Sequence, residues 1–248
     1  MDAVDSLLPP PLIDARSLHK SYGALLVLNG VDFDVQPGDA VGIVGPNGAG
    51  KTTLLTVLSG TNFSNSGSVH FRGQDVGSLD AAQRCKLGIA RTHQVPRPFL
   101  GMTVFENIFS AATHGGGFSR DDAYDRCIDA LELCGMKGVA NRKADTLGLL
   151  DRKRLELTRA LATDPLVLLL DEIGGGLTDG EASELVDTIR QLHARQIGIV
   201  WIEHIVHVLL QVVNRLVCMD AGKVIATGDP KAVLSNSAVI EAYLGSAT

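Results

Sequence analysis

Hydrophobic and polar residues follow two different periods along the first third of this chain. Residues 31–35 and 67–71 alternate with a period of two, which is typical of half-buried β-strands. Residues 40–44 come after a Pro-Gly turn as a nearly continuous apolar run, which predicts a strand buried on both faces. Residues 51–58 then show the pattern of a helix. This part of the chain therefore predicts strands packed around an early helix.

The remainder divides into a helical stretch and an alternating stretch. From about residue 99 to residue 159 only the helical period is present. Beyond it, strand-like segments at 166–170, 197–202 and 215–219 alternate with helical segments at about 181–195 and 204–212. That order is typical of a parallel sheet with crossover helices. We therefore expect an α/β core interrupted by a helical insertion at about residues 95–160.

Composition and charge narrow the class of protein. Of 248 residues 45% are hydrophobic and 20% charged, as in globular proteins. The net charge of -6 disfavours nucleic acid as a partner, because a phosphate backbone needs a basic surface. The four cysteines are far apart and form no C-x-x-C pair, so we expect reduced thiols and no zinc site.

The N-terminus and the apolar runs bear on location. Residues 1–11 carry two acids and a triple proline instead of a basic start and an apolar run, so we expect a flexible arm and no signal peptide. The richest apolar stretches, residues 166–170 and 206–213, are far shorter than the roughly 20 residues that cross a bilayer. A soluble, intracellular protein is expected, with membrane contact only through a partner.

A glycine-rich stretch lies between the apolar run at residues 40–44 and the helix predicted after it. It consists of Gly45, Pro46, Asn47, Gly48, Ala49, Gly50, Lys51, Thr52 and Thr53, and it fits the pattern G-x-x-x-x-G-K-S/T. Its glycines let backbone N–H groups point at phosphate oxygens, and the helix N-terminus adds a favourable partial charge. Lys51 would neutralise the β- and γ-phosphates and Thr52 would bind Mg²⁺. The stretch predicts an ATP site.

Two carboxylates follow the apolar strand at residues 166–170. Asp171 and Glu172 lie at the carboxyl end of that strand, where open α/β sheets bind ligands. Alone, such a pair is more often a solvated strand end, but the phosphate loop upstream favours function. Asp171 suits a second contact to the metal, and Glu172 suits a general base for the attacking water.

With these motifs the chain resembles the ATPase subunits of ATP-binding-cassette (ABC) transporters, and among them the branched-chain amino-acid uptake group. The group is most evident at residues 102–107, 222–228 and 239–245. The resemblance implies an α/β fold: a P-loop NTPase core with a mixed or parallel sheet, an antiparallel β subdomain and the helical insertion. These would form a single domain over residues 12–248.

Three further residues take their roles from this resemblance. Tyr22 matches the aromatic residue on which the family stacks adenine, although a lone tyrosine is more often a packing residue. Gln94 matches the glutamine that touches metal and water and links the site to the helical insertion. His204 matches the histidine that contacts the γ-phosphate, although an isolated histidine is more often structural.

The family signature, which resembles L-S-G-G-Q, is degenerate here. The aligned residues run from Leu147 to Asp151, with Gly148 in place of serine, Leu150 in place of the second glycine and Asp151 in place of glutamine. In the family this segment closes over ATP held by the other subunit's phosphate loop. A leucine would obstruct the phosphate and an aspartate would repel it.

Two smaller departures follow the carboxylate pair. Ile173 stands where a proline is common, and Thr178 stands where the family carries an acidic or amide residue. Both put the efficiency of hydrolysis in question, and neither concerns nucleotide binding.

The resemblance implies partners as well as chemistry. We expect transmembrane permease subunits and a second ATPase subunit, with a heterodimer favoured over a homodimer, on the cytoplasmic face of the membrane. The solute would be a branched-chain amino acid or a related small amide. Three alternatives stay open: a catalytically weak regulatory subunit, a non-transport ABC ATPase, and an exporter, since direction resides in the permease.

Overall fold

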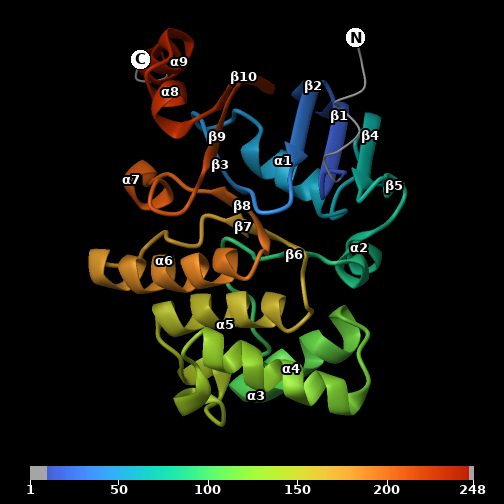
Figure 1. Ribbon diagram of the computed structural model, residues 1–248, viewed down its shortest axis with the longest axis vertical. Helices are drawn as coiled ribbons and strands as arrows, with labels where there is room; N and C mark the ends of the chain where they lie inside the picture. The colour runs from blue at the N-terminus through green and yellow to red at the C-terminus, as the bar shows by residue number, and fades with distance from the viewer. Residues whose placement is uncertain (1–9, 246–248) are drawn as a thin grey trace.

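The computed structural model describes residues 10–245 as two sheets with helices packed around them (Figure 1). The predicted α/β class with a mixed sheet, an antiparallel β unit and inserted helices is confirmed. Most of the predicted N-terminal arm lies outside the described residues. No helix within residues 10–245 is both long and apolar enough to cross a membrane.

The smaller sheet is antiparallel, with the strand order β2-β1-β4-β5. Its strands are β1 (Ile13–Tyr22), β2 (Leu25–Val35), β4 (Ser66–Phe71) and β5 (Gln74–Asp75). The sequence pattern predicted β4 and the second half of β2 but missed β1. The register of β1 shifts between Ala15 and Leu18, where Ser17 has a φ of 48°. Such a bulge interrupts the period of two, which explains the omission.

The larger sheet has the order β10-β9-β3-β8-β7-β6 and is parallel except for β10. Its strands are β3 (Ala40–Val44), β6 (Ile89–Arg91), β7 (Val167–Asp171), β8 (Gly198–Ile202), β9 (Arg215–Asp220) and β10 (Lys223–Gly228). Every residue of β3, β7 and β8 is buried, which is why these strands read as apolar runs. β6 has three residues and β10 is half-buried, and neither was predicted from the pattern.

Two hydrophobic cores lie on opposite faces of the larger sheet. Val41 and Ile43 of β3 belong to the core shared with the antiparallel sheet and α1 (Lys51–Leu58). Ala40 and Val44, on the other face of the same strand, belong to the core shared with the inserted helices. β3 is therefore fixed from both sides at the point where the phosphate loop begins.

Helices of the α/β core flank the larger sheet. They are α1, α2 (Ala81–Leu87), α6 (Asp179–Ala194) and α7 (Val206–Leu209). The helix predicted at residues 204–212 was wrong in length, because α7 is a single turn. Its N-cap, Ile205, provides no side-chain hydrogen bond, and the segment is rich in β-branched valines of low helix propensity.

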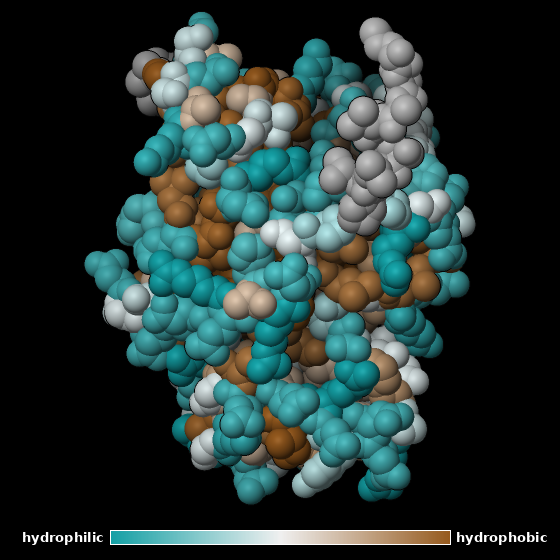
Figure 2. Space-filling model, viewed as in Figure 1, coloured by the Kyte–Doolittle hydropathy of each residue, from teal (hydrophilic) through white to brown (hydrophobic). Residues whose placement is uncertain are grey.

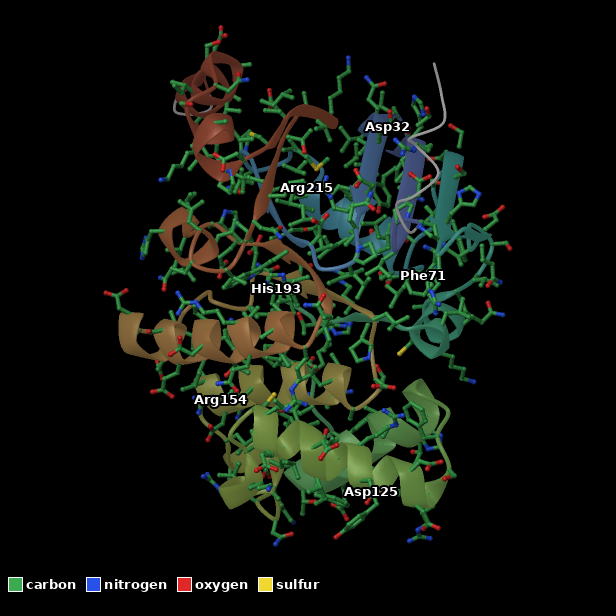
Figure 3. The ribbon with its side chains drawn as sticks, in the orientation of Figure 1. Asp32, Phe71, Asp125, Arg154, His193 and Arg215 are labelled. Atoms are coloured by element: carbon green, nitrogen blue, oxygen red, sulfur yellow. The ribbon has the colours of Figure 1, made fainter. Side chains whose placement is uncertain are left out.

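The inserted helices form one end of the molecule, at the bottom of Figure 1. They are α3 (Val104–Ser110), a π-helical turn (Ala111–Gly115), α4 (Arg120–Leu133) and α5 (Leu149–Leu161). Capping residues start α3 and α4: Thr103 forms a capping box with Glu106 at α3, and Ser119 accepts the N–H of Asp122 at α4. α5 faces α6, where Arg154 pairs with Glu184 (Figure 3).

The C-terminal part crosses to the other end of the molecule. After β10 come α8 (Pro230–Leu234) and α9 (Ser237–Gly245), drawn in red at the upper left of Figure 1. The face shown in Figure 2 is mostly hydrophilic, with hydrophobic patches beside these elements. The four cysteines all lie within the described range and are free, as predicted, and three of them are buried.

Candidate active site

The phosphate loop joins the end of β3 to the start of α1, as its sequence predicted. Gly50 is the N-cap of α1 and has a φ of 100°, and Gly48 has a φ of 80°. A Cβ atom on Gly45 would lie 2.0 Å from the carbonyl oxygen of Met219. Only glycine fits at position 45, because any side chain would collide with the backbone of β9.

Lys51 is nearly buried at the first residue of α1. Its ammonium group donates to the carbonyl oxygens of Gly45, at 2.7 Å, and of Pro46, at 2.9 Å. Burial lowers the pKa of Lys51, and the negative charges of Glu172 and Asp171 oppose that shift. The Lys51 ammonium group therefore holds the two ends of the Gly45–Pro46 segment by hydrogen bonds, and its charge lies close to their carbonyl oxygens.

A cavity of about 250 Å³ opens over the loop. Its lining residues are Leu25, Val27, Asn47, Gly48, Ala49, Gly50, Lys51, Thr52, Thr53 and Glu172. Thr52 is exposed, so its hydroxyl is available to a ligand. Pro46 instead lines a neighbouring cavity beside α9. The sequence analysis did not predict that Leu25 and Val27 line this cavity. The only signal in the sequence was the run of apolar residues after the turn between β1 and β2.

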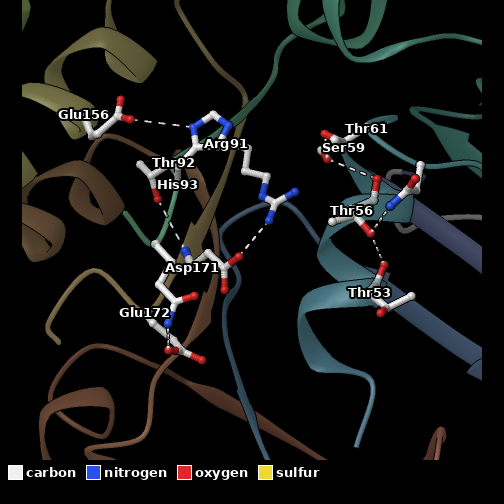
Figure 4. A network of polar contacts seen from close by, with 12 residues as sticks. Thr53, Thr56, Ser59, Thr61, Arg91, Thr92, His93, Glu156, Asp171 and Glu172 are labelled. Carbon is white, nitrogen blue, oxygen red and sulfur yellow. Dashed lines mark hydrogen bonds and ion pairs between the residues drawn. The ribbon is translucent and has the colours of Figure 1, made fainter. Parts of the chain in front are cut away.

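Asp171 is the last residue of β7 and is 1% exposed. Its Oδ2 accepts a hydrogen bond from Arg91 at 2.7 Å, and its Oδ1 is buried without a hydrogen-bond partner (Figure 4). A buried carboxylate oxygen without a partner costs free energy unless a ligand satisfies it. Together with the Thr52 hydroxyl and the Gln94 amide oxygen, it supplies the hard oxygen donors that Mg²⁺ prefers. These residues fit the metal.

Glu172 links three segments of the chain. Gln94 donates its amide hydrogen to one carboxylate oxygen, and His204 Nε2 lies 2.8 Å from the other. The backbone of Glu172 has a φ of 48°, and its N–H donates to Ile202 on β8 at 2.9 Å. A non-glycine residue in this conformation is strained, and such strain is concentrated at functional sites. The structure thus brings the three residues predicted to be catalytic into direct contact.

A buried carboxylate beside this group was missed by the sequence analysis. Glu203 is 3% exposed, and it accepts the N–H of Gly174 at 2.8 Å and the N–H of His204 at 3.2 Å. Burial raises its pKa, while these hydrogen bonds and the charge of Lys153 oppose the shift. Glu203 ties the loop after Glu172 to the loop that carries His204. Its only signal in the sequence was its place beside the histidine.

Tyr22 lies at the end of β1, outside the residues that line the cavity over the loop. Its side chain is 47% exposed, and its hydroxyl accepts from Asn62 at 3.0 Å. It pairs across the strands with Leu25, which is also exposed and does line the cavity. The two side chains offer an apolar surface next to the phosphate site.

The degenerate signature forms the start of α5. Gly148 is the N-cap and offers no side-chain hydrogen bond, and Asp151 lies in the first turn, 4.0 Å from Arg154. Leu149 also departs from the pattern L-S-G-G-Q, because it stands at the first glycine. Leu149 is 46% exposed, and a methyl group on Gly176 would lie 3.3 Å from it. Bulky and acidic groups therefore surround this helix N-terminus, where anions otherwise bind.

The two smaller departures have structural explanations. Ile173 is 2% exposed and belongs to the core between the sheet and the inserted helices. Thr178 is the N-cap of α6 and forms a capping box with Glu181. The threonine hydroxyl is thus engaged in starting a helix.

Three features define a P-loop ATPase: a loop whose conformation requires glycines, a lysine hydrogen-bonded to that loop, and carboxylates at the end of a strand. A model of the ABC transporter family matches residues 28–174, and a model of branched-chain amino acid ATP-binding cassette transporters matches residues 223–248. The chain therefore belongs to the ABC transporter ATPases, whose activity is ATP hydrolysis.

Individual relatives agree with this assignment. The high-affinity branched-chain amino acid transport ATP-binding protein LivG of Escherichia coli K12 is 34% identical, over 96% of this chain and 99% of LivG. BraF of Pseudomonas aeruginosa, described in the same words, is 31% identical over 96% and 99%. A nucleotide-free ATP-binding cassette superimposes with a TM-score of 0.87 at 30% identity, over 94% of this chain and 99% of that structure. The ADP conformation of the cassette MJ1267 gives 0.86 at 30% identity, over 95% and 99%.

Proposed function

We propose that this ATPase energises the uptake of branched-chain amino acids or related small amides through a membrane permease. The observation that carries the proposal is the joined group of Glu172, Gln94 and His204 beside the phosphate loop. The names of the relatives and the match at residues 223–248 support the class of solute.

The phosphate loop would hold ATP through its backbone N–H groups, with Lys51 neutralising the β- and γ-phosphates. Mg²⁺ would be held by Thr52, Asp171 and Gln94, and when bound it neutralises charge that develops on the phosphate oxygens. Tyr22, with Leu25 beside it, would stack on the adenine.

Glu172 would orient the attacking water and accept its proton, because its carboxylate is aimed by two hydrogen-bond partners. His204 would contact the γ-phosphate from the same group, since it already lies beside that carboxylate. Gln94 would move when the nucleotide is bound or hydrolysed, and this motion would be transmitted to the inserted helices.

The segment after Gln94 supports a permease-facing surface. Val95, Phe99, Leu100 and Met102 are all large, apolar and at least 40% exposed. The same segment is tied to α5, because Arg97 N–H donates to the buried Glu156 at 3.0 Å and Arg159 donates to the Arg97 carbonyl at 3.0 Å. Motion of Gln94 could thus reach the inserted helices through contiguous bonded groups.

The degenerate signature supports pairing with a different ATPase subunit. In a head-to-tail pair each ATP would lie between one phosphate loop and the partner's signature, so a homodimer of this chain would hold two sites capped by Leu149, Leu150 and Asp151. A heterodimer would keep one complete site. The complex would lie on the cytoplasmic face of the membrane and contact it only through the permease, without a nucleic-acid partner.

The test is to purify the complex from membranes and to measure uptake of radiolabelled leucine into vesicles that contain it. We expect permease subunits and a second ATPase to co-purify and uptake to require ATP. A cysteine placed at Phe99 should crosslink to permease loops, and one placed at Leu26, on the antiparallel sheet, is the matched control. Crosslinks from position 26 alone would refute the orientation. ATP-independent uptake would refute the proposal, and ATP-dependent uptake that is unchanged in Glu172→Gln would favour a regulatory subunit that seldom hydrolyses ATP.

A further inference from the structure

A hydroxyl group of the C-terminal helix reaches the phosphate loop. Tyr243 of α9 accepts a hydrogen bond from the backbone N–H of Gly45, with 2.8 Å between the two atoms. The two residues are 198 positions apart in the chain. Gly45 is the first residue of the loop, so this contact joins the last described helix to the nucleotide site.

The N–H of Gly45 lies just past the end of the strand ladder. The last paired residues of β3 and β9 are Val44 and Cys218, one position earlier. A buried backbone N–H needs an acceptor, and beyond the ladder the Tyr243 hydroxyl provides it. The Gly45 carbonyl accepts from Lys51, and Met219 closes the space around its Cα. The N–H, the carbonyl oxygen and the Cα of Gly45 are therefore each fixed by a contact, with Tyr243, Lys51 and Met219 respectively.

α9 is anchored in a way that fixes the position of this tyrosine. Val239, one turn before Tyr243 and on the same face of α9, is 2% exposed and belongs to the core that contains β3. A cavity of about 570 Å³ separates the rest of α9 from the loop, between Glu241 on one side and Pro46 and Asn47 on the other. The Tyr243 hydroxyl thus contacts the loop directly, at the side of this cavity.

We propose that Tyr243 is a positioning residue that holds the phosphate loop in its nucleotide-binding shape, so that the C-terminal segment sets the affinity for ATP. The proposal rests on the nucleotide role of the loop proposed above. When the hydroxyl is absent, the Gly45 N–H loses its acceptor and the loop must be ordered by the nucleotide itself. That ordering reduces the observed affinity.

The test is the substitution Tyr243→Phe in the full chain, which removes the hydroxyl and keeps the ring. We expect the Kd for MgATP, measured by calorimetry, to rise about fivefold, which is the usual effect of one lost hydrogen bond. Turnover of the assembled complex at saturating ATP should be unchanged, because Glu172 and its partners are intact. Tyr124→Phe, on α4, is the matched control and should leave the Kd unchanged.

A second measurement separates positioning from a purely structural role. Amide hydrogen exchange of the peptide that contains Gly45 should be faster in Tyr243→Phe than in the unmodified protein, and saturating MgATP should restore protection. An unchanged Kd together with unchanged exchange would overturn the proposal. A lower melting temperature with an unchanged Kd would also overturn it, because the hydroxyl would then only stabilise the fold.

Lys51→Ala distinguishes failure of this inference from failure of the proposed function. If Lys51→Ala lowers MgATP affinity and Tyr243→Phe does not, only the role of Tyr243 is wrong. If neither substitution changes the affinity, the loop does not bind the nucleotide and both proposals are wrong.

Discussion

The phosphate loop and the signature segment, the two parts of the proposed ATP-binding machinery on this chain, differ in how completely their polar groups are arranged. At the phosphate loop, Lys51, Asp171 and Glu172 each have defined polar partners, and the loop glycines have the conformations that only glycine readily adopts. At the signature segment, Gly148 caps α5 without a side chain and Leu149 is an exposed apolar residue. The first segment has the glycines, lysine and carboxylates expected of a phosphate site, and the second has no side-chain hydrogen bond at its N-cap.

From this difference we infer that the two half-sites have separate functions. A phosphate loop and its carboxylates serve the ATP bound to their own chain, whereas a signature would serve the ATP bound to the partner. Loss of the signature therefore leaves catalysis on this chain's own nucleotide possible, provided that the partner supplies an intact signature. The comparison predicts unequal effects from equivalent substitutions in the two subunits.

The largest effect should come from Glu172→Gln in this chain. The amide keeps the size of the side chain but cannot accept the proton of the attacking water, so turnover of the assembled complex should fall about a hundredfold or more. MgATP affinity should be retained. The measurement is steady-state ATP hydrolysis by the purified complex, together with calorimetry on the isolated subunit.

The matched control is the equivalent substitution in the second ATPase subunit. We expect a smaller loss there, because the site on that subunit would be capped by the degenerate signature. Equal losses from the two substitutions would contradict the asymmetry, and an unchanged rate in Glu172→Gln would contradict the role of the glutamate itself.

A smaller effect, a gain, should follow restoration of the signature. The variant replaces Gly148 by serine, Leu149 and Leu150 by glycine, and Asp151 by glutamine, which removes two bulky side chains and one negative charge near the phosphate. ATP hydrolysis by this chain alone should rise about tenfold, as expected for about 1.4 kcal/mol of added phosphate contact.

Gly148→Ser alone is the control for the restored signature. A serine at this N-cap should add only a few tenths of a kcal/mol to the free energy of unfolding, because glycine is itself a fair N-cap residue, and it should not clear the obstruction. Its hydrolysis rate should therefore stay near that of the unmodified chain. If the single variant hydrolyses ATP as fast as the full restoration, the missing cap and not the obstruction is the defect.

The elements that could be predicted from the sequence are those with a single dominant pattern. β3 and β7 are buried on both faces, so their apolar runs identified them, and the phosphate loop lies directly between β3 and α1. β1 was missed because a bulge breaks its alternation, and α7 was predicted too long because apolar residues alone do not make a helix.

For the candidate site, the sequence analysis could assign only those residues that belong to a motif or to the family resemblance. Most of the phosphate-loop residues line one cavity with Glu172, and Gln94 and His204 contact that glutamate, whereas Tyr22 lies outside the cavity. The groups that orient these residues carry no motif. Arg91 pairs with Asp171 from another strand, Glu203 accepts the N–H of Gly174, and Tyr243 accepts the N–H of Gly45. Contacts of this kind depend on which chain segments the fold brings together, and that information is absent from any local pattern.

The smallest effect concerns Glu203, whose hydrogen bonds to Gly174 and His204 connect the two loops beside Glu172. Burial raises its pKa above the ordinary value of 4.5, so between that value and the raised one the folded protein holds more protons than the unfolded chain. The free energy of unfolding contributed by this group must then fall as pH rises through that window. Urea unfolding at about pH 4 and about pH 8 should show Glu203→Gln gaining stability relative to the unmodified protein at the higher pH. Asp125→Asn, an exposed carboxylate on α4, controls for the loss of one acidic group, and an equal gain in that variant would show that net charge, and not burial of Glu203, sets the dependence.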